Sequence, residues 1–169
     1  MARTGAERVA LNDTQARQRE FWQSACRAVP DLSPTADYQV WHFGDSERLA
    51  RDLADLVLHG PKRATAGLLW DAELDPTMMP VQGGYSLVTD HAGVPLLIIR
   101  TMRVEVRPYD DVDADFAAAE GEGDGSLDYW RAAHWAYFAR RCDALGRAPS
   151  NDMPVILERF ALVYPAGGS

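Results

Sequence analysis

The chain contains a single lysine, Lys62, in a turn-forming segment that also carries a hydroxyl side chain. Of the 17 lysines and arginines, all but Lys62 are arginines. Arginine stays protonated in proteins, whereas a lysine can lose its proton and act as a base. Thr65 lies three residues after Lys62, and an amine beside a hydroxyl is the minimum for an activated nucleophile. The alternative is a stray surface lysine in an arginine-rich protein.

A carboxylate could orient this pair or balance its charge. Residues 110–128 carry eight Asp and Glu residues, with glycines interleaved near the end of the segment. Glu122 stands between Gly121 and Gly123 and is the best placed by type, with Glu120 two residues away. For most of these carboxylates the alternative is a solvated acidic loop with weak affinity for divalent ions. An EF-hand is not supported, because the spacing of residues 110–115 lacks the central Gly and the terminal Glu.

Composition limits the class of protein. A chain of 169 residues with 47% hydrophobic residues fits one domain with a substantial core. The formal net charge of −8 argues against a positive surface for duplex nucleic acid, so no duplex DNA partner is expected. No apolar run approaches membrane-spanning length, and the N-terminus has no signal-peptide core. We therefore expect a cytoplasmic protein with no membrane association.

Hydrophobic periodicity and turn residues predict the elements that position these side chains. Residues 1–12 are expected to form a loose arm, and Gly60 and Pro61 to end a helix so that Lys62 falls in a turn. The predicted helices are 14–29, 45–59 and 126–145, the last capped by Ser126, and the predicted strands are 38–42, 65–70, 85–89, 94–107 and 155–164.

The order of these elements predicts an α+β fold. Strands and helices do not alternate as in a parallel sheet, so a small, mostly antiparallel β-barrel flanked by helices is expected, with an N-terminal helix. Alternation along strand 94–107 places Met102, Val104 and Val106 on an apolar inner face, and Arg100 with them. A β-bulge that turns Arg100 outward is the alternative.

Residues that suit nucleic-acid binding are present but few. Arg63, Arg100 and Arg103 could form a narrow basic mouth beside Lys62, and Trp41, Trp70, Tyr85 and Tyr129 could stack on bases. Aromatic residues in strands and helices are more often core residues. A short single strand or a nucleoside fits such a mouth better than a duplex. The predicted set for substrate or RNA is Arg63, Arg100, Trp41, Tyr85, Ser126 and Tyr129.

Five segments together resemble the ASCH domain family of the PUA-like superfamily. They are Trp41–Ser46, Gly60–Ala66, Ile99–Thr101, Ala119–Asp124 and Ser126–Trp130. The resemblance covers about residues 38–164 and implies a β-barrel with helices beside it and a cleft that contains the Lys62 loop. It divides the chain into an N-terminal arm and helix, residues 1–36, and the ASCH domain, residues 37–165.

The resemblance implies an RNA-directed activity. Longer members resemble ribonucleases that act on single-stranded RNA, with a divalent metal, Mn²⁺ or Mg²⁺, as a cofactor. Short members include amidohydrolases that deacylate N4-acetylcytidine, and their catalytic Lys, Thr and Glu correspond to Lys62, Thr65 and Glu122. The longer chain places the ribonuclease first and the amidohydrolase second. This chain departs from the family pattern at Arg63, where many members carry Thr.

Three hypotheses remain open from the sequence. As a hydrolase, the protein would use Lys62 as a base with a pKa lowered by burial, Thr65 as nucleophile or positioning group, and Glu122 to hold the lysine or protonate the leaving group. As a non-catalytic RNA-binding module, it would use Lys62 as a phosphate contact. An adaptor that binds proteins through the N-terminal helix has the least support, because residues 17–27 suit a solvated face.

Overall fold

The fold combines a five-stranded mixed sheet with helices. The computed structural model describes residues 5–165, with side chains from Asp13 onward. The strands follow the order β1-β3-β4-β5-β2, with β1 parallel to β3 and β2 antiparallel to β5. They are β1 (Tyr38–Trp41), β2 (Ala64–Leu68), β3 (Tyr85–Thr89), β4 (Pro95–Pro108) and β5 (Pro154–Tyr164). The helices are α1 (Gly5–Ala28), α2 (Glu47–His59), α3 (Leu69–Leu74), α4 (Ala114–Glu120) and α5 (Leu127–Ala144).

The α+β class is confirmed, whereas the closed barrel is not supported. Among the described strands, β1 and β2 stand at the two ends of the sheet order, and no pairing joins them. The sheet is also mixed, because β1 pairs with β3 in parallel, whereas a mostly antiparallel arrangement was predicted. The parallel pairing of β1 with β3 needs a crossover, and α2 lies in the chain between these two strands.

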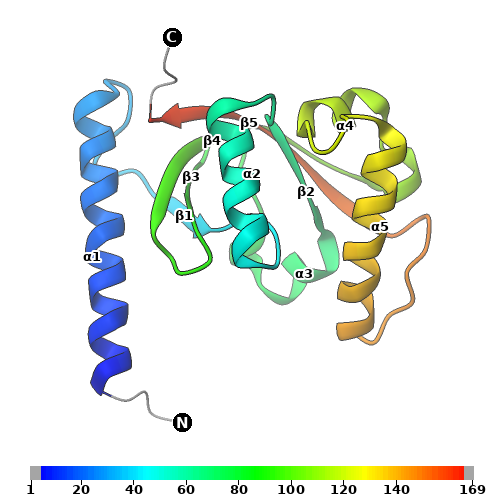
Figure 1. Ribbon diagram of the computed structural model, residues 1–169, viewed down its shortest axis with the longest axis horizontal. Helices are drawn as coiled ribbons and strands as arrows, with labels where there is room; N and C mark the ends of the chain where they lie inside the picture. The colour runs from blue at the N-terminus through cyan, green and yellow to red at the C-terminus, as the bar shows by residue number, and fades with distance from the viewer. Residues whose placement is uncertain (1–4, 166–169) are drawn as a thin grey trace. The chain divides into compact units, whose positions relative to one another are not determined.

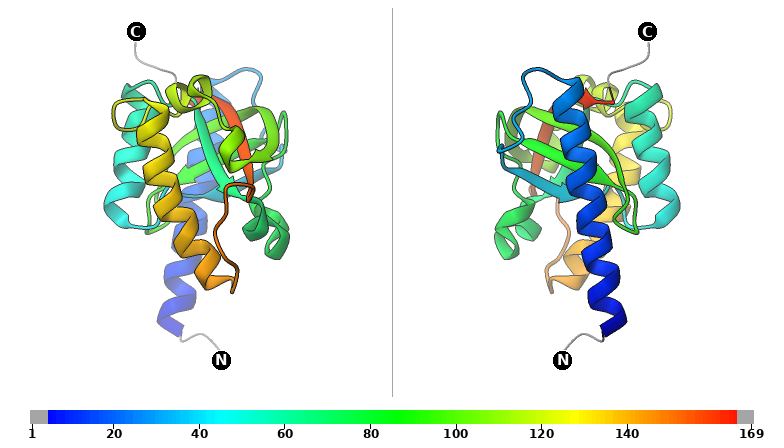
Figure 2. Two further views of the ribbon diagram at one scale, coloured as in Figure 1. Left: turned by 90° about the vertical axis from the view of Figure 1, so that its right-hand side faces the viewer. Right: turned by 90° about the vertical axis from the view of Figure 1, so that its left-hand side faces the viewer.

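The chain divides into two compact units. Of the described residues, 5–58, 85–99 and 162–165 belong to the first unit, and 59–84 and 100–161 to the second. In the first, the C-terminal half of α1 packs on strands through Trp22, whose indole stacks on Tyr38 at 4.2 Å. Figure 2 shows this part of α1 against the strands. The helix begins at Gly5, so the predicted arm is helical from there, and residues 1–4 lie outside the described residues.

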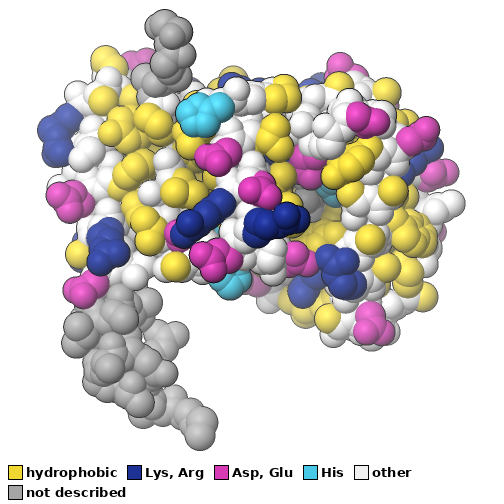
Figure 3. Space-filling view, in the orientation of Figure 1, with side chains coloured by type: hydrophobic (Ala, Val, Ile, Leu, Met, Phe, Trp, Pro, Cys, Tyr) yellow, Lys and Arg dark blue, Asp and Glu magenta, His cyan; other side chains and the backbone are white. Residues whose placement is uncertain are grey.

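Helix α2 of the first unit buries one face and exposes a charged one. Leu53 and Val57 of the predicted stripe are buried, together with Ala50 and Ala54, whereas Leu49 is exposed. The outer face carries ion pairs one turn apart, Arg48 with Asp52 and Arg51 with Glu47. Figure 3 shows acidic and basic side chains interleaved over α2. The helix leads directly into the Lys62 turn.

The second unit packs α4 and α5 on one face of β2 and β5 (Figure 1). Ala64 and Leu68 of β2 contribute to this core with Trp130 and Phe138 of α5. Because side chains alternate along a strand, Thr65 lies on the opposite face of β2 from Ala64 and Leu68. Thr65 therefore points away from this core.

Several predicted elements differ in the second unit. The strand predicted at 65–70 is β2, which ends at Leu68. Leu69 and Trp70 instead belong to helix α3 (Leu69–Leu74). The acidic segment is not all loop, since Asp113 caps α4 by accepting a hydrogen bond from the Phe116 amide at 2.9 Å. Pro154 begins β5 one residue earlier than predicted.

The inward orientation predicted for Arg100 is wrong. Arg100 is exposed, and its Nε donates to the Gly83 carbonyl at 3.3 Å. Met102 and Val106, predicted to face inward, are 55% and 46% exposed. The strand is buried on both faces from Leu97 to Ile99, so its hydrophobic run does not reveal the register. After Ile99, the next buried residue of β4 is Thr101, whose hydroxyl contacts Glu158 of β5.

Candidate active site

Lys62 is held by the backbone of its own turn. The Arg63 amide donates to the Ala119 carbonyl at 2.7 Å, and the Phe160 amide donates to the Arg63 carbonyl at 2.9 Å. These bonds tie the residue after Lys62 to the end of α4 on one side and to β5 on the other. The Lys62 side chain is fully buried, with 0% of its surface exposed. The surface lysine considered as the alternative is therefore excluded.

Two glycines shape the acidic loop that receives the lysine. Gly121 ends α4 with a φ of 64°, and a Cβ there would lie 2.6 Å from Cγ of Pro61. Gly123 has a φ of 58°, and a Cβ there would lie 2.4 Å from the ring of Tyr129. Both positions need glycine for the backbone angle and for space. The interleaved glycines therefore let Glu122 and its neighbour approach the Lys62 turn closely.

The Lys62 amine lies between two carboxylates. Its Nζ donates to Oε2 of Glu120 at 2.9 Å and to Oε1 of Glu122 at 2.6 Å. The Glu120 side chain is 1% exposed, whereas that of Glu122 is 19% exposed. Both glutamates left open by the sequence thus contact the lysine. Glu122 is the one that a substrate can reach.

Glu120, the last residue of α4, is the centre of a buried hydrogen-bonded cluster that includes two residues of α5. Its Oε1 accepts from the indole Nε1 of Trp130 at 2.9 Å and lies 3.3 Å from Nε2 of His134. The other ring nitrogen of His134, Nδ1, lies 3.0 Å from the Trp130 carbonyl oxygen. Both imidazole nitrogens face acceptors, and only the doubly protonated ring can donate to both. The geometry favours the imidazolium.

The protonation state of Lys62 differs from the one that the mechanism expected from the sequence requires. Burial by itself lowers the pKa of Lys62, but the charges of Glu120 and Glu122 and their hydrogen bonds outweigh burial. The pKa of Lys62 is therefore raised above its ordinary value, not lowered. The prediction of a lowered pKa, which the lysine base requires, is wrong. Lys62 is an ammonium that donates hydrogen bonds.

The two carboxylates differ in the direction of their pKa shifts. Burial alone would raise the pKa of Glu120, but the charges of Lys62 and His134 hold it far below its usual range. Burial raises the pKa of Glu122, and the charge of Glu120 adds to this against the opposing effect of Lys62. The pKa of His134 is raised, because Glu120 outweighs the lowering caused by burial. Glu120 is thus a fixed anion, and Glu122 is the carboxyl better suited to exchange protons.

Thr65 lies on β2 opposite Glu158 of β5, in direct register. It is half-buried, and among the described residues no hydrogen bond joins its hydroxyl to the Lys62 amine. Lys62 and Glu122 are therefore together, whereas Thr65 is not paired with either of them. A substrate that used all three would have to contact both the Lys62–Glu122 pair and Thr65.

The predicted arginines lie at the surface of the same unit. Arg63 is exposed, and its guanidinium donates to the carbonyl of Lys62 at 2.6 Å. Arg103 pairs with Glu105 at 3.1 Å, so part of its charge is compensated. Substrate binding by Arg63 and Arg100 stays a prediction.

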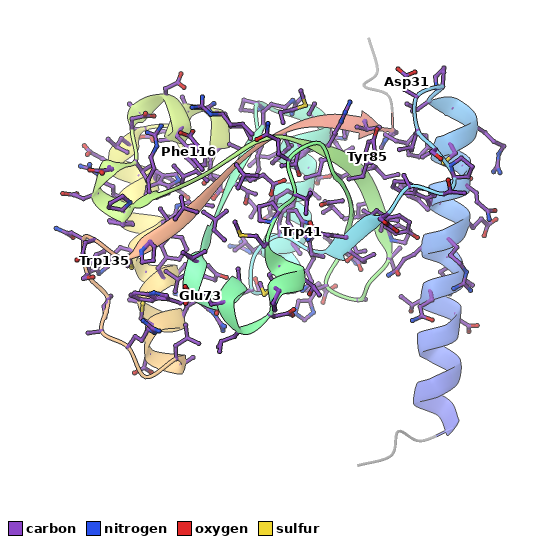
Figure 4. All side chains as sticks on the ribbon, turned by 180° about the vertical axis from the view of Figure 1, so that it is seen from behind. Asp31, Trp41, Glu73, Tyr85, Phe116 and Trp135 are labelled. Atoms are coloured by element: carbon purple, nitrogen blue, oxygen red, sulfur yellow. The ribbon has the colours of Figure 1, made fainter. Side chains whose placement is uncertain are left out.

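Trp41 and Tyr85 lie in the first unit and make aromatic contacts there. Trp41 meets Phe43 edge-on at 4.8 Å, and Tyr85 meets Trp22 edge-on at 5.9 Å. Figure 4 shows Trp41 at the end of β1 and Tyr85 at the start of β3. Tyr85 also packs against the core under α1. Stacking of either ring on a base stays a prediction.

Ser126 has a structural role at the start of α5. Its Oγ accepts from the Tyr129 amide at 3.1 Å, which confirms the predicted N-cap. Tyr129 is 44% exposed, and its ring lies over Gly123 beside the acidic loop. Tyr129 is therefore better placed than Ser126 to meet a substrate, and binding by either residue stays a prediction.

We expect Ser126→Ala to lower the free energy of unfolding by about 1 kcal/mol, because an α5 amide loses its capping acceptor. Urea denaturation followed by circular dichroism measures this. Ser24→Ala is the matched control, since Ser24 lies inside α1 and alanine is a good helix former there. Equal stability of Ser126→Ala and the wild type would contradict the cap.

The described residues do not form an evident metal centre. Among them, no group of three or more His, Cys, Asp or Glu side chains could hold a metal ion. Glu120 and Glu122 are occupied by the Lys62 ammonium, which is a poor neighbour for a cation. The donor set thus does not fit the divalent metal implied by the ribonuclease type. Within the described part of the chain, no helix is long and apolar enough to span a membrane.

Comparison with known proteins identifies the family. The ASCH domain model matches residues 39–164, so the chain belongs to the ASCH domain family. The chain is similar to the crystal structure of an ASCH domain from Lactobacillus crispatus JV V101, with 36% identity and a TM-score of 0.79 over 88% of this chain and 95% of that one. It is also similar to a crystal structure of a protein from Enterococcus faecalis V583, with 30% identity and a TM-score of 0.77 over 89% of this chain and 91% of that one. No curated protein matches the chain.

Sequence reasoning missed the roles of three residues of the site region. His134 was interpreted as a core or edge histidine, and its position four residues after Trp130 on one helix face was the available signal. Glu158 directly follows three apolar residues of a predicted strand, and a carboxylate in that position was a signal of a buried functional group. Thr101 entered only through a family motif, and nothing in the sequence connects it with Glu158.

Proposed function

We propose that this protein is a hydrolase that cleaves the acyl-amide bond of a small neutral nucleoside of the N4-acetylcytidine type. The observation that carries the proposal is the fully buried Lys62 ammonium between Glu120 and Glu122, with only Glu122 open to a substrate. A buried, charged cluster is costly unless its groups are paired, and such clusters are frequent in active sites. Membership of the ASCH domain family supports an activity on RNA or its components.

The burial of Lys62 argues against a simple phosphate contact. A lysine that binds phosphate presents its ammonium to solvent, whereas the surface of Lys62 is 0% exposed. Glu122, the accessible member of the cluster, would repel a phosphate. The net charge of −8 acts in the same direction. These observations favour a neutral substrate over an RNA strand and disfavour the non-catalytic RNA-binding module.

In this hydrolase, Lys62 and Glu122 act as a proton-donating pair. The hydrogen bond of 2.6 Å lets the pair share a proton, and the raised pKa of Glu122 helps it to exchange that proton with a substrate. The pair protonates the leaving nitrogen when the carbon–nitrogen bond breaks. Thr65 supplies the nucleophilic oxygen, as the family pattern implies. Glu120, Trp130 and His134 hold the lysine in place.

Cleavage of single-stranded RNA is the second candidate. The exposed Arg100 and Arg63 in the unit that holds Lys62 support it, since guanidinium groups suit phosphates. The described residues include no group of side chains that could hold the metal of a metal-assisted ribonuclease. Glu122 would also repel the phosphates of the RNA backbone. We therefore place the amidohydrolase first.

A product assay by mass spectrometry tests the proposal. Wild type, Lys62→Arg and Glu122→Gln are each given N4-acetylcytidine or a short single-stranded RNA, with and without Mn²⁺. We expect wild type to release cytidine and Glu122→Gln to be slower by about 10²–10⁴-fold, the usual contribution of a general acid–base group. Glu73→Gln, an exposed carboxylate on α3, is the matched control and should retain the wild-type rate.

Each result leads to one conclusion. Cytidine release that depends on Lys62 and Glu122 supports the amidohydrolase. Cleaved RNA with intact N4-acetylcytidine would transfer the assignment to a ribonuclease. If wild type left both substrates unchanged, the hydrolase proposal would be rejected.

A further inference from the structure

Glu158 of β5 is a buried carboxylate that the chemistry of Lys62 does not use. Its surface is 5% exposed, and its Oε1 accepts a hydrogen bond from the Thr101 hydroxyl at 2.6 Å. Within the described part of the chain, no cation pairs with it. A buried carboxylate without a positive partner destabilises a fold when it is ionised. Its presence on β5 between the buried residues Leu157 and Phe160 therefore needs a functional explanation.

The register of the sheet places Glu158 beside Thr65. The two residues are directly opposed on the antiparallel strands β5 and β2. The Cβ atoms of opposed residues are about 4.5–5.5 Å apart, and their side chains lie on the same face. A glutamate can reach across such a pair to a threonine hydroxyl. Among the described residues, no hydrogen bond joins the Thr65 hydroxyl to the Lys62 amine, so a contact with Glu158 would not compete with one to the lysine.

We propose that Glu158 is a further catalytic residue, the general base that takes the proton of Thr65. This inference rests on the proposed function, in which Thr65 supplies the nucleophile. Lys62 cannot be this base, because its buried amine is already protonated. Thr101 is a positioning residue, because its hydroxyl fixes one oxygen of Glu158 and leaves the other for Thr65.

The reaction balances with the groups of the second unit and one water. The Glu158 carboxylate takes the Thr65 proton while the Thr65 oxygen bonds to the acyl carbon. The carbon–nitrogen bond then breaks, and the leaving nitrogen receives a proton from the pair of Lys62 and Glu122. Water next attacks the acyl-threonine and returns a proton to that pair. The carbon–oxygen bond to Thr65 breaks last, and protonated Glu158 returns the proton to the Thr65 oxygen.

The surroundings of Glu158 suit a base. Burial raises the pKa of Glu158, and the hydrogen bond from Thr101 opposes this effect only in part. Glu158 faces Thr101 on β4 and Thr65 on β2, and among the described residues no charged side chain contributes to its pKa. A carboxylate whose pKa lies closer to neutrality is a stronger base than an exposed one.

Acetylation of Thr65 by p-nitrophenyl acetate tests the inference without the natural substrate. Wild type, Glu158→Gln and Thr65→Val are acid-quenched after mixing with the ester, and peptide mass spectrometry locates the acetyl group. We expect wild type to be acetylated at Thr65, and Glu158→Gln to be acetylated there about 10²-fold more slowly. Glu73→Gln is the matched control, and melting curves by circular dichroism show that each variant is folded.

The outcomes separate this inference from the proposed function. If Thr65 is acetylated through Glu158 while N4-acetylcytidine stays intact, the base is supported and the proposed substrate is rejected. If Glu158→Gln is acetylated at Thr65 as fast as wild type, Glu158 is not the base, whatever the substrate. Wild type without acetyl-Thr65 would also overturn the inference.

Thr101→Val adds a readout that a purely structural role would not change. Loss of its hydroxyl raises the pKa of Glu158 further, because the hydrogen bond from Thr101 lowers that pKa. The acidic limb of the acetylation rate against pH should therefore move to higher pH, with the rate on the plateau kept. An unchanged limb would contradict the role of Glu158.

Discussion

Lys62→Met is expected to lower the free energy of unfolding by about 3–5 kcal/mol, the usual cost of removing one partner of a buried ion pair. Methionine nearly fills the space of the lysine but leaves the buried Glu120 and the half-buried Glu122 without the ammonium that they share. The two carboxylates then repel each other. The variant should also lose hydrolase activity, since the leaving group loses its proton donor.

The pH dependence of this loss has a definite sign. In the wild type the pKa of Glu120 is lowered, so its contribution to stability is present above the ordinary pKa of a glutamate and is lost in acid. Without Lys62, burial favours the protonated carboxyls, so the variant loses stability as the pH rises. The difference between the two proteins should therefore be larger at pH 8 than at pH 5. Urea denaturation at both values measures it.

Arg103→Met is the control for loss of a positive charge. Arg103 lies at the surface and pairs with Glu105 at 3.1 Å, and exposed ion pairs contribute at most about 1 kcal/mol. A similar loss for Lys62→Met would show that the Lys62 cluster contributes little to stability. The proposed active site would then lose the rigid arrangement on which its chemistry depends.

The sequence predicted the parts of the site that are local along the chain. A helix that ends before Gly60 and a loop with glycines around Glu122 can both be derived from backbone preferences, and the structure has both. The pKa of Lys62 could not be derived in this way. Burial alone predicted a lowered pKa, whereas the result depends on Glu120, which lies 58 residues away in the sequence.

The fold was predictable in its elements more than in their pairing. Helices α1, α2 and α5 and the five strands follow from periodicity, whereas α3 and α4 were not predicted. The parallel pairing of β1 with β3 and the open sheet depend on contacts between distant segments. The orientation of Arg100 shows the same limit. Leu97–Ile99 are buried on both faces, so the register became visible only through the hydrogen bond from Thr101 to Glu158. That same register places Glu158 opposite Thr65.

Glu120→Gln is expected to cost about 3–5 kcal/mol of unfolding free energy, because Glu120 is the common acceptor of a buried charged cluster. In the wild type it accepts from Lys62 and Trp130 and lies beside His134. Glutamine keeps the shape of the side chain but carries no charge, and its amide nitrogen must face a donor. Urea denaturation and a titration of the His134 ring by NMR measure the effects on stability and on pKa.

The His134 titration separates this variant from Lys62→Met. In the wild type the pKa of His134 is raised, so its contribution to stability is present below the ordinary value of about 6.5 and is lost as the pH rises through the folded pKa. In Glu120→Gln burial dominates and lowers the pKa of His134, so the variant loses stability as the pH falls below about 6.5. The deficit of Glu120→Gln should thus grow from pH 8 to pH 5.5, whereas that of Lys62→Met should shrink. Parallel slopes for the two variants would show that His134 is neutral in the wild type, and Glu120 would then balance the charge of Lys62 alone.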